Sequence, residues 1–335
     1  MGKLLNFAVR FACTFYCNTT RVHSRQINAL GQSIKPNRAC NMWHFISEHI
    51  SDETGQFFSC QKAERVSGGD THDSYIIKDS AHRYFVKTRG YDDTQQLSLE
   101  AEGINAIANT QTIATPQVIC HGITANETPN MEYLVLSHVR FVEPTVPDYF
   151  TLGQQLAALH AVNAYTSYGW PHDNYIGASV QTNGRMASWA DFFAEKRIGS
   201  MLERLASNGL WSKESGDIDG IVTKVKHLLS LHQPHPSLLH GDLWAGNVGF
   251  NKKGPVLFDP AVYVGDAETD LAMAELFGGF PQTFFEGYNQ HTPIEKNYAL
   301  RKPIYQLYHI LNHGLLFGAH YIAQANQMVD DIYSH

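Results

Sequence analysis

The alternation of apolar and polar positions predicts a strand-rich first part of the chain. An amphipathic helix is predicted over residues 42–54, and two-residue periodicity predicts strands at Tyr75–Lys78 and Arg83–Thr88. The remaining elements are a helix over residues 98–109 and strands within residues 112–123 and 131–139. This pattern predicts a small β-rich region that contains one internal helix.

From residue 151 onward, helical periodicity dominates the chain. Helices are predicted over residues 151–163, 188–209, 218–232, 269–280 and 303–326. A strand-rich region followed by a helical one predicts an α+β fold with an N-lobe over residues 42–140 and a C-lobe over residues 141–335. Such a bilobal order is typical of the protein-kinase-like arrangement, with ATP binding assigned to the N-lobe and catalysis to the C-lobe.

Within the helical region, the stretch LLHGDLWAGN (residues 238–247) interrupts the pattern. Pro234 and Pro236 exclude a helix before it, and Leu238 and Leu239 suffice for a short buried β-bridge. The following VGFNKKGPVLF (residues 248–258) predicts a β-hairpin. The loop therefore opens at the mouth of a hairpin.

Three polar side chains are expected to converge at that hairpin. Asp242 and Asn247 lie on the loop before it, and Asp259 follows its return strand. Carboxylate and amide oxygens are hard ligands that suit Mg²⁺, which keeps its other positions for water and phosphate. The spacing from His240 through Asp242 to Asn247 is that of a kinase catalytic loop, with Gly241 in place of Arg. We therefore predict Asp242 as the base and Asn247 and Asp259 as Mg²⁺ ligands.

The strand-rich region offers groups for ATP phosphates. Lys87 in YFVKT is the candidate for the phosphate-binding lysine, and Glu100 and Glu102 both qualify as its ion-pair partner. Gly68 and Gly69 could cover the phosphates with backbone N–H groups, although a full G-x-G-x-x-G is absent. A lysine that ends an apolar strand is also often a plain solvated end.

The run YLVLSHV is the candidate linker between the lobes. The backbone of Ser137, His138 and Val139 is expected to bind the adenine edge, with a plain core strand as the equal alternative.

The composition of the chain limits the kinds of partner and the cellular compartment that we expect. The net charge is −7 and the longest basic run is Lys252–Lys253, so nucleic acid is not expected as a partner. No apolar run approaches the roughly 20 residues that span a bilayer, so no membrane is expected either. Five scattered cysteines without a C-x-x-C are typical of reduced thiols and indicate a cytoplasmic protein. Residues 1–41 contain no acid, and we interpret them as a disordered extension, with a transit peptide as the alternative.

These motifs together resemble those of the fructosamine kinase (ketosamine kinase) family, which belongs with the aminoglycoside phosphotransferase-like kinases. The resemblance runs from about Arg65 to Tyr333 and less securely from Met42. Its motifs are HGDLWAGN, FDPAVYVGDAETDLAM, FGGFPQTFFEGY and SWADFFAEKRI. The tryptophan after Asp-Leu separates this family from aminoglycoside and choline kinases.

The resemblance implies roles for particular residues. Asp242 would take the proton of the substrate hydroxyl, and Glu100 rather than Glu102 would hold Lys87. Asp270 would brace the catalytic loop, and Trp244 would either pack beside the sugar or belong to the core. The reaction implied is transfer from ATP to the 3-hydroxyl of ketosamines, free or as glycated lysines, which would serve protein deglycation by a monomer or weak homodimer.

Three other functions are alternatives to this one. A kinase for another hydroxylated amine (an aminoglycoside, thiamine or choline) shares the HGD loop but not the Trp. A nucleotide-binding pseudokinase scaffold is disfavoured because Lys87, Asp242, Asn247 and Asp259 are all present. A zinc hydrolase is weaker still, since no H-E-x-x-H occurs.

Overall fold

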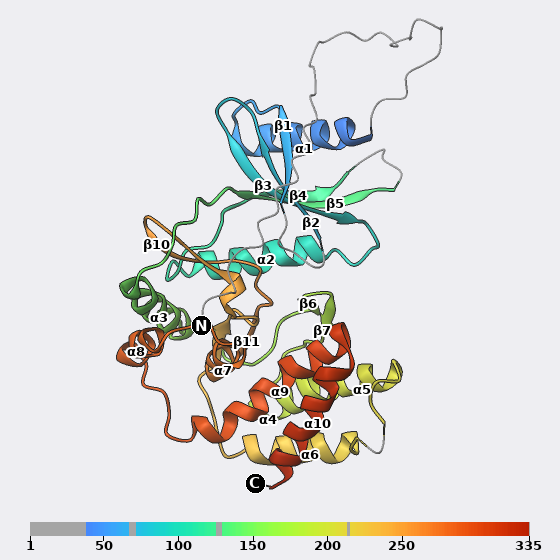
Figure 1. Cartoon of the computed structure of the whole chain (residues 1–335), viewed down its shortest axis with the longest axis vertical. Helices are drawn as coiled ribbons and strands as arrows, with labels where there is room; N and C mark the ends of the chain where they lie inside the picture. Colours follow the sequence, from blue (N-terminus) through green and yellow to red (C-terminus); the bar gives the residue numbers. More distant parts are fainter. Residues whose placement is uncertain (1–37, 67–71, 125–128, 213–214, 335) are drawn as a thin grey trace, which may run out of the picture. The chain divides into compact units, whose positions relative to one another are not determined.

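The computed structural model describes residues 38–66, 72–124, 129–212 and 215–334 (Figure 1). The chain divides into two compact units, one within Met1–Ala101 together with Gln117–Val139, the other comprising Glu102–Pro116 and Arg140–His335. The expected disordered extension lies outside the described residues as far as residue 37. The first helix begins at Arg38 rather than at Met42. The lobe boundary expected at residue 140 stays a prediction.

The first unit is built on an antiparallel sheet. Its described strands follow the order β1-β2-β3-β5-β4. Ile46 and Ile50 of the first helix pack with Ile77 and Val86 of the sheet. Burial of these aliphatic side chains contributes about 1.5–3 kcal/mol each. The elements are α1 (Arg38–Thr54), β1 (Lys62–Val66), β2 (Asp73–Lys78), β3 (Arg83–Gly90), α2 (Gln96–Asn109), β4 (Val118–Ile123) and β5 (Met131–Ser137). Helix α2 belongs to this unit as far as Ala101 and to the second unit from Glu102 onward.

The second unit is mostly helical, and its described residues include three short strand pairs and isolated bridges. Strand β8 pairs with β11, β9 with β10 and β6 with β7, and Ala114 bridges Val256. The helices are α3 (Val146–His160), α4 (Trp189–Phe192), the π-helical η1 (Phe193–Gly199), α5 (Ser200–Ser207), α6 (Ile218–Leu229), the 3₁₀ turn η2 (Ala245–Asn247), α7 (Glu268–Leu276), α8 (Gln282–His291), α9 (Tyr298–Phe317) and α10 (Ala319–Ser334). The strands are β6 (Asn174–Ile176), β7 (Ser179–Gln181), β8 (Ser237–Leu239), β9 (Val248–Asn251), β10 (Gly254–Leu257) and β11 (Tyr263–Gly265).

Helices α3 and α8 approach each other at two glycines. A Cβ atom on Gly153 would lie 2.0 Å from the carbonyl oxygen of Phe284, and one on Gly287 would lie 2.1 Å from that of Phe150. No side chain fits at either position, so the two backbones are in direct contact. This approach brings His160 of α3 next to Tyr288 of α8.

The structure corrects three of the expected elements. The helix expected over residues 188–209 contains the π-helical turn Phe193–Gly199. The helix expected over residues 303–326 breaks at Gly318, which has a φ of 87°. The helix expected over residues 269–280 ends at Leu276, and α8 follows it. The predicted hairpin over residues 248–258 is confirmed as β9 and β10. Among the described residues, no helix has both the length and the apolar character that crossing a membrane requires.

Candidate active site

The loop that contains Asp242 is held at both ends by short strands. Leu238 and Leu239 pair with Val264 and Tyr263, and the β9–β10 hairpin follows the loop. Gly241 has a φ of 82°, and a Cβ there would lie 2.0 Å from the carbonyl oxygen of Ala261. Only glycine fits this position, which explains why the kinase-type Arg is absent from it.

The side chains of Asp242 and Asn247 meet, and Asn247 also lies beside the backbone of Asp259. The side-chain nitrogen of Asn247 donates to the Asp242 carboxylate (Nδ2–Oδ2 3.0 Å) and to the Asp242 carbonyl oxygen (2.9 Å). It also lies 3.5 Å from the carbonyl oxygen of Asp259. With its nitrogen committed in this way, Asn247 offers its oxygen Oδ1 to a cation. This oxygen and the Asp259 carboxylate are the hard ligand types that Mg²⁺ accepts, so the donor set fits the ion.

The environment of Asp242 makes its carboxylate basic. Burial disfavours the charged form and raises the pKa of Asp242 to about 7, and the charges of Asp259 and Asp270 add to the rise. The hydrogen bond from Asn247 acts in the opposite direction. A general base works best when its pKa is close to the working pH. Asp242 has this property.

Asp259 has an unusual backbone conformation. Its φ of 56° lies in the left-handed region, which few residues other than glycine adopt, although aspartate tolerates it better than most. The neighbouring Phe258 donates its N–H to the Asn247 carbonyl (3.1 Å), and Ala261 donates to the His240 carbonyl (2.8 Å). His240 also donates from Nε2 to the Phe258 carbonyl (3.0 Å). The segment that carries Asp259 is therefore tied to the catalytic loop on both sides.

Asp270, at the start of α7, holds the catalytic loop by hydrogen bonds to its backbone. Its carboxylate accepts the backbone N–H of His240 (2.8 Å) and of Gly241 (2.9 Å). His160 contacts the same carboxylate (Nε2–Oδ2 3.1 Å) and has Tyr288 OH 2.9 Å from Nδ1. Burial opposes ionisation of Asp270, but the hydrogen bond and charge of His160 outweigh it and lower the pKa. The resemblance pointed to Asp270. No sequence signal pointed to His160, which lies in a predicted helix, or to Tyr288, which lies in a helix that was not predicted.

In the first unit, Lys87 of β3 pairs with Glu100 of α2. The two groups are 2.8 Å apart, with side-chain exposures of 8% and 12%. A buried charge needs such a partner, because isolated charges are strongly disfavoured away from water. Glu102 makes other contacts, since it accepts from Trp170 Nε1 (2.9 Å) and lies 3.0 Å from His172 Nε2. The structure thus places Glu100, and not Glu102, at the lysine.

The position of α2 depends on Glu132, which the sequence analysis did not identify. This fully buried carboxylate on β5 accepts the backbone N–H groups of Leu97 and Ser98 at the start of α2 (2.9 and 3.1 Å). Its other oxygen lies 3.4 Å from Arg89, two residues after Lys87 on β3. The available signal was an acid near the start of an otherwise apolar strand.

The remaining predicted nucleotide contacts are described in part. Ser137 ends β5, with its Oγ accepting the backbone N–H of Gln117 (2.9 Å), and His138 and Val139 follow the strand directly. Gly68 and Gly69 lie outside the described residues. Trp244 is 41% exposed, which rules out the core position that was its alternative. A Cβ on Gly246 would lie 2.2 Å from the Trp244 ring, so this ring covers the glycine.

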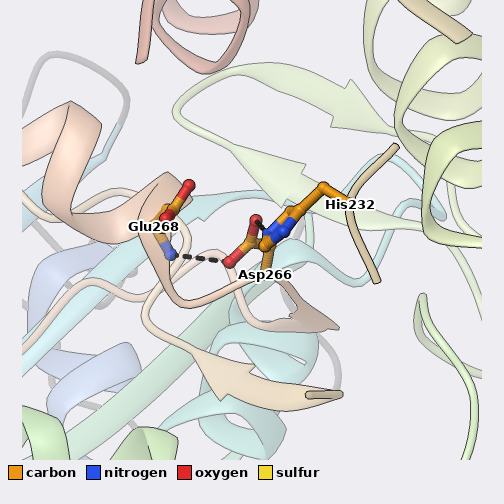
Figure 2. A group of neighbouring side chains, drawn as sticks. All are labelled: His232, Asp266 and Glu268. Carbon is orange, nitrogen blue, oxygen red and sulfur yellow. Dashed lines mark hydrogen bonds and ion pairs between the residues drawn. The ribbon is translucent and has the colours of Figure 1, made fainter. Parts of the chain in front are cut away.

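A second group of side chains that could bind a metal lies near the paired strands β8 and β11 (Figure 2). His232 precedes β8, and Asp266 and Glu268 follow β11. His232, Asp266 and Glu268 place one ligand atom each within 4.8 Å of one another. Arg301, however, contacts both oxygens of Glu268 (2.6 Å each), and Tyr305 donates to Asp266 (2.5 Å). A guanidinium repels a cation and already occupies the carboxylate. We therefore interpret this group as a buried ion-pair cluster rather than a metal centre.

Comparison with known proteins adds to this geometry. A family model described as fructosamine kinase matches residues 42–335. A probable ketoamine kinase of Synechocystis is 45% identical over 291 residues, covering 86% of this chain and 95% of that protein. One of Vibrio parahaemolyticus is 42% identical over 299 residues, covering 88% of this chain and all of that protein.

Solved structures share the fold. The crystal structure of a putative fructosamine-3-kinase from Haemophilus somnus superposes with a TM-score of 0.82 at 30% identity, covering 88% of this chain and 99% of that one. The aminoglycoside phosphotransferase APH(4)-Ia, solved with AMP-PNP and hygromycin B, gives 0.56 at 15% identity, covering 86% of this chain and 97% of that one. The predicted α+β, protein-kinase-like fold is confirmed.

Proposed function

Because this chain belongs to the fructosamine kinase family, we propose that it transfers the γ-phosphoryl group of ATP to the 3-hydroxyl of a ketosamine. As a member of a kinase family it is an ATP-dependent phosphotransferase. The observation that carries the proposal is the pair of Asp242 and Asn247, 3.0 Å apart at the catalytic loop. The two relatives are called probable ketoamine kinases, and this supports a ketosamine as the acceptor.

Asp242 would act as the base. Its Oδ2 accepts from Asn247, which leaves Oδ1 to accept the proton of the substrate hydroxyl. The hydroxyl oxygen then forms a bond to the γ-phosphorus while the bond to the ADP oxygen breaks. The pKa of about 7 suits this proton transfer. Asp270 keeps the backbone before Asp242 in place, so that the carboxylate is oriented before the substrate arrives.

Asn247 and Asp259 would hold Mg²⁺, and Lys87 would bind the α- and β-phosphates. Bound Mg²⁺ neutralises phosphate charge as it develops during transfer. Glu100, 2.8 Å from the Lys87 ammonium, would orient it toward the phosphates. The backbone of Ser137, His138 and Val139 would bind adenine, and Gly68 and Gly69 would cover the phosphates.

The biological role would be deglycation. A phosphate on the 3-oxygen would be a leaving group next to the ketosamine carbonyl. After loss of a proton from carbon 1, the enaminol would expel phosphate, and water would hydrolyse the resulting imine to release the amine. The substrate would be a free ketosamine or a glycated lysine, and the exposed Trp244 would pack beside the sugar.

The proposal is tested by ADP release with Mg-ATP and fructosyl-, ribulosyl- and erythrulosyl-lysine, beside thiamine, choline and an aminoglycoside. We expect turnover on a ketosamine, with phosphorus-coupled NMR locating the phosphate on the 3-oxygen. Turnover restricted to another amine would overturn the ketosamine assignment, and phosphate on a different oxygen would overturn the position. Release of free lysine from the phosphorylated product tests the deglycation role.

A further inference from the structure

Strands β6 and β7 carry buried amide side chains of unexplained purpose. Asn174 begins β6, Gln181 ends β7 and Asn183 follows two residues later, with exposures of 4%, 0% and 4%. Burying an amide is unfavourable unless its hydrogen bonds are replaced. Each of these amides therefore requires partners, and their identity indicates what the hairpin does.

The partners lie in the backbone immediately after Asp259. Gln181 donates from Nε2 to the carbonyl oxygen of Ala261 (2.9 Å), and Asn174 donates from Nδ2 to that of Val262 (2.8 Å). Gln181 also donates to Asn174 Oδ1 (2.8 Å), so the two amides are joined. Two of the three residues that follow Asp259 are thus held by their carbonyl oxygens.

Further donors fix which way these amides point. Tyr308 OH donates to Gln181 Oε1 (2.9 Å), and Asn183 donates to Asn174 Oδ1 (2.8 Å). Arg197 donates from Nη2 to Asn183 Oδ1 (2.8 Å). Because the amide oxygens all receive donors, the nitrogens of Gln181 and Asn174 must face the carbonyl groups.

Arg197, the last donor in this series of hydrogen bonds, is itself held in place. Arg197 belongs to the π-helical turn Phe193–Gly199 and is 0% exposed. Its guanidinium lies 3.9 Å from the centre of the Tyr263 ring and 4.6 Å from that of Phe192. π-Helical turns often occur at functional sites. Here the turn supplies a rigid donor at the far end of the amide chain.

We propose that Gln181 and Asn174 are positioning residues that keep Asp259 in its left-handed conformation and so present its carboxylate to a divalent cation. A non-glycine residue stays at such a φ only when its surroundings hold it. The amides hold the segment through the carbonyl oxygens of Ala261 and Val262, while His240 accepts the Ala261 N–H from the opposite side. The inference rests on the proposed metal-binding role of Asp259.

The test is cation binding rather than turnover. Mn²⁺ is titrated into the full chain with AMP-PNP, and free Mn²⁺ is followed by its electron paramagnetic resonance signal. Gln181→Met keeps the length of the side chain and removes both its donor and its acceptor. We expect Mn²⁺ to bind about 10–100-fold more weakly, which is the usual effect of removing a group that orients a ligand. Binding of AMP-PNP without metal should stay unchanged. The control is Gln154→Met on α3, whose partner is Gln290.

A second variant keeps the proposal open to refutation if Gln181→Met does not fold. Tyr308→Phe removes only the hydroxyl that fixes the Gln181 amide, and we expect a smaller weakening in the same direction. Mn²⁺ affinity within twofold of the unmodified chain, in either folded variant, would overturn the inference. AMP-PNP binding that does not depend on Mn²⁺ in the unmodified chain would overturn it as well. Failure on all ketosamines with Mn²⁺-dependent AMP-PNP binding intact would contradict the proposed substrate alone.

Discussion

Asp270 Oδ1 accepts the backbone N–H of Gly241 at 2.9 Å, one residue before the proposed base. The same carboxylate receives the N–H of His240 and contacts His160. A buried anion that accepts several donors fixes their positions more strongly than neutral acceptors do. The buried Asp270 therefore fixes the backbone that leads into Asp242.

Asp270→Asn tests this positioning. An amide has one oxygen. Its NH₂ group would therefore face the N–H of Gly241 in one orientation, and the N–H of His240 together with His160 in the other. We expect kcat to fall about 100-fold, as small displacements of a catalytic group commonly cause. Nucleotide affinity should change little. Steady-state kinetics beside equilibrium AMP-PNP binding measures both quantities.

Asp330→Asn is the matched control, because Asp330 is exposed on α10. An Asp270→Asn variant that is folded and retains the kcat of the unmodified chain would contradict the positioning role.

Asp242→Asn should abolish turnover and stabilise the fold at neutral pH. Burial raises the folded pKa of Asp242 to about 7 from its ordinary value of 3.8, so the native state binds this proton more tightly than the unfolded state does. The unmodified chain therefore loses stability as the pH rises from about 4 to about 7. Asparagine does not titrate, so the variant does not lose this stability. The variant should therefore exceed the unmodified chain in stability by the full amount at pH 7 and above, and by nothing below about pH 4.

The measurement is the melting temperature of both proteins between pH 5 and pH 8. Each kcal/mol of stabilisation raises it by about 2–4 °C. In the unmodified enzyme, kcat/KM should also rise with pH up to about 7, where the free base becomes ionised. A variant no more stable than the unmodified chain at pH 8 would contradict the raised pKa.

Glu100→Gln tests which of two glutamates, Glu100 or Glu102, is the functional partner of Lys87. It removes the charge that faces Lys87 at 2.8 Å, so we expect the KM for ATP to rise about tenfold or more, in line with a loss of 1.4 kcal/mol. Glu102→Gln lies on the same helix and contacts Trp170 and His172 instead. Its KM for ATP should stay close to that of the unmodified chain. Equal effects of the two substitutions would refute the assignment of Glu100.

Local sequence signals were sufficient for much of the fold and for the catalytic loop. The hairpin over residues 248–258 follows from strand alternation around a turn, and the spacing of Asp242, Asn247 and Asp259 follows from the loop that precedes it. Side chains a few residues apart can be placed in this way because turn chemistry is local. Whether these residues and Lys87 act as proposed stays a prediction.

The parts that sequence reasoning missed depend on distant contacts. Helix α8 contains three aromatic residues, a glycine and an asparagine, and it is helical because Phe284 and Tyr288 are buried and Gly287 meets α3. Glu132 reaches α2 from 34 and 35 residues away in sequence, and Gln181 reaches Ala261 from 80 residues away. Nothing within the sequence surroundings of these residues specifies such partners.

The ion pair of His232 with Asp266 makes the stability of the second unit depend on pH. The two groups are 2.8 Å apart, with side-chain exposures of 9% and 4%. Burial alone would lower the pKa of His232, but the hydrogen bond and charge of Asp266 outweigh burial and raise it above 6.5. A raised folded pKa means that the stabilisation is complete below pH 6.5 and is lost as the pH rises through the folded value.

His232→Gln should therefore lower the melting temperature most at pH 6 and least at pH 9. The hydrogen bond to a charged partner contributes roughly 1.5–3 kcal/mol, and glutamine retains a neutral donor, so the loss at pH 6 should be about half of that. Differential scanning fluorimetry at half-unit pH steps measures it. His227→Gln, on the exposed side of α6, is the control and should follow the unmodified chain at every pH. If the difference between His232→Gln and the unmodified chain were constant from pH 6 to pH 9, His232 would act through its shape alone. The ion pair would then contribute nothing to the pH dependence. A neutral imidazole and a glutamine amide carry no charge, so the difference in stability that they cause is the same at every pH.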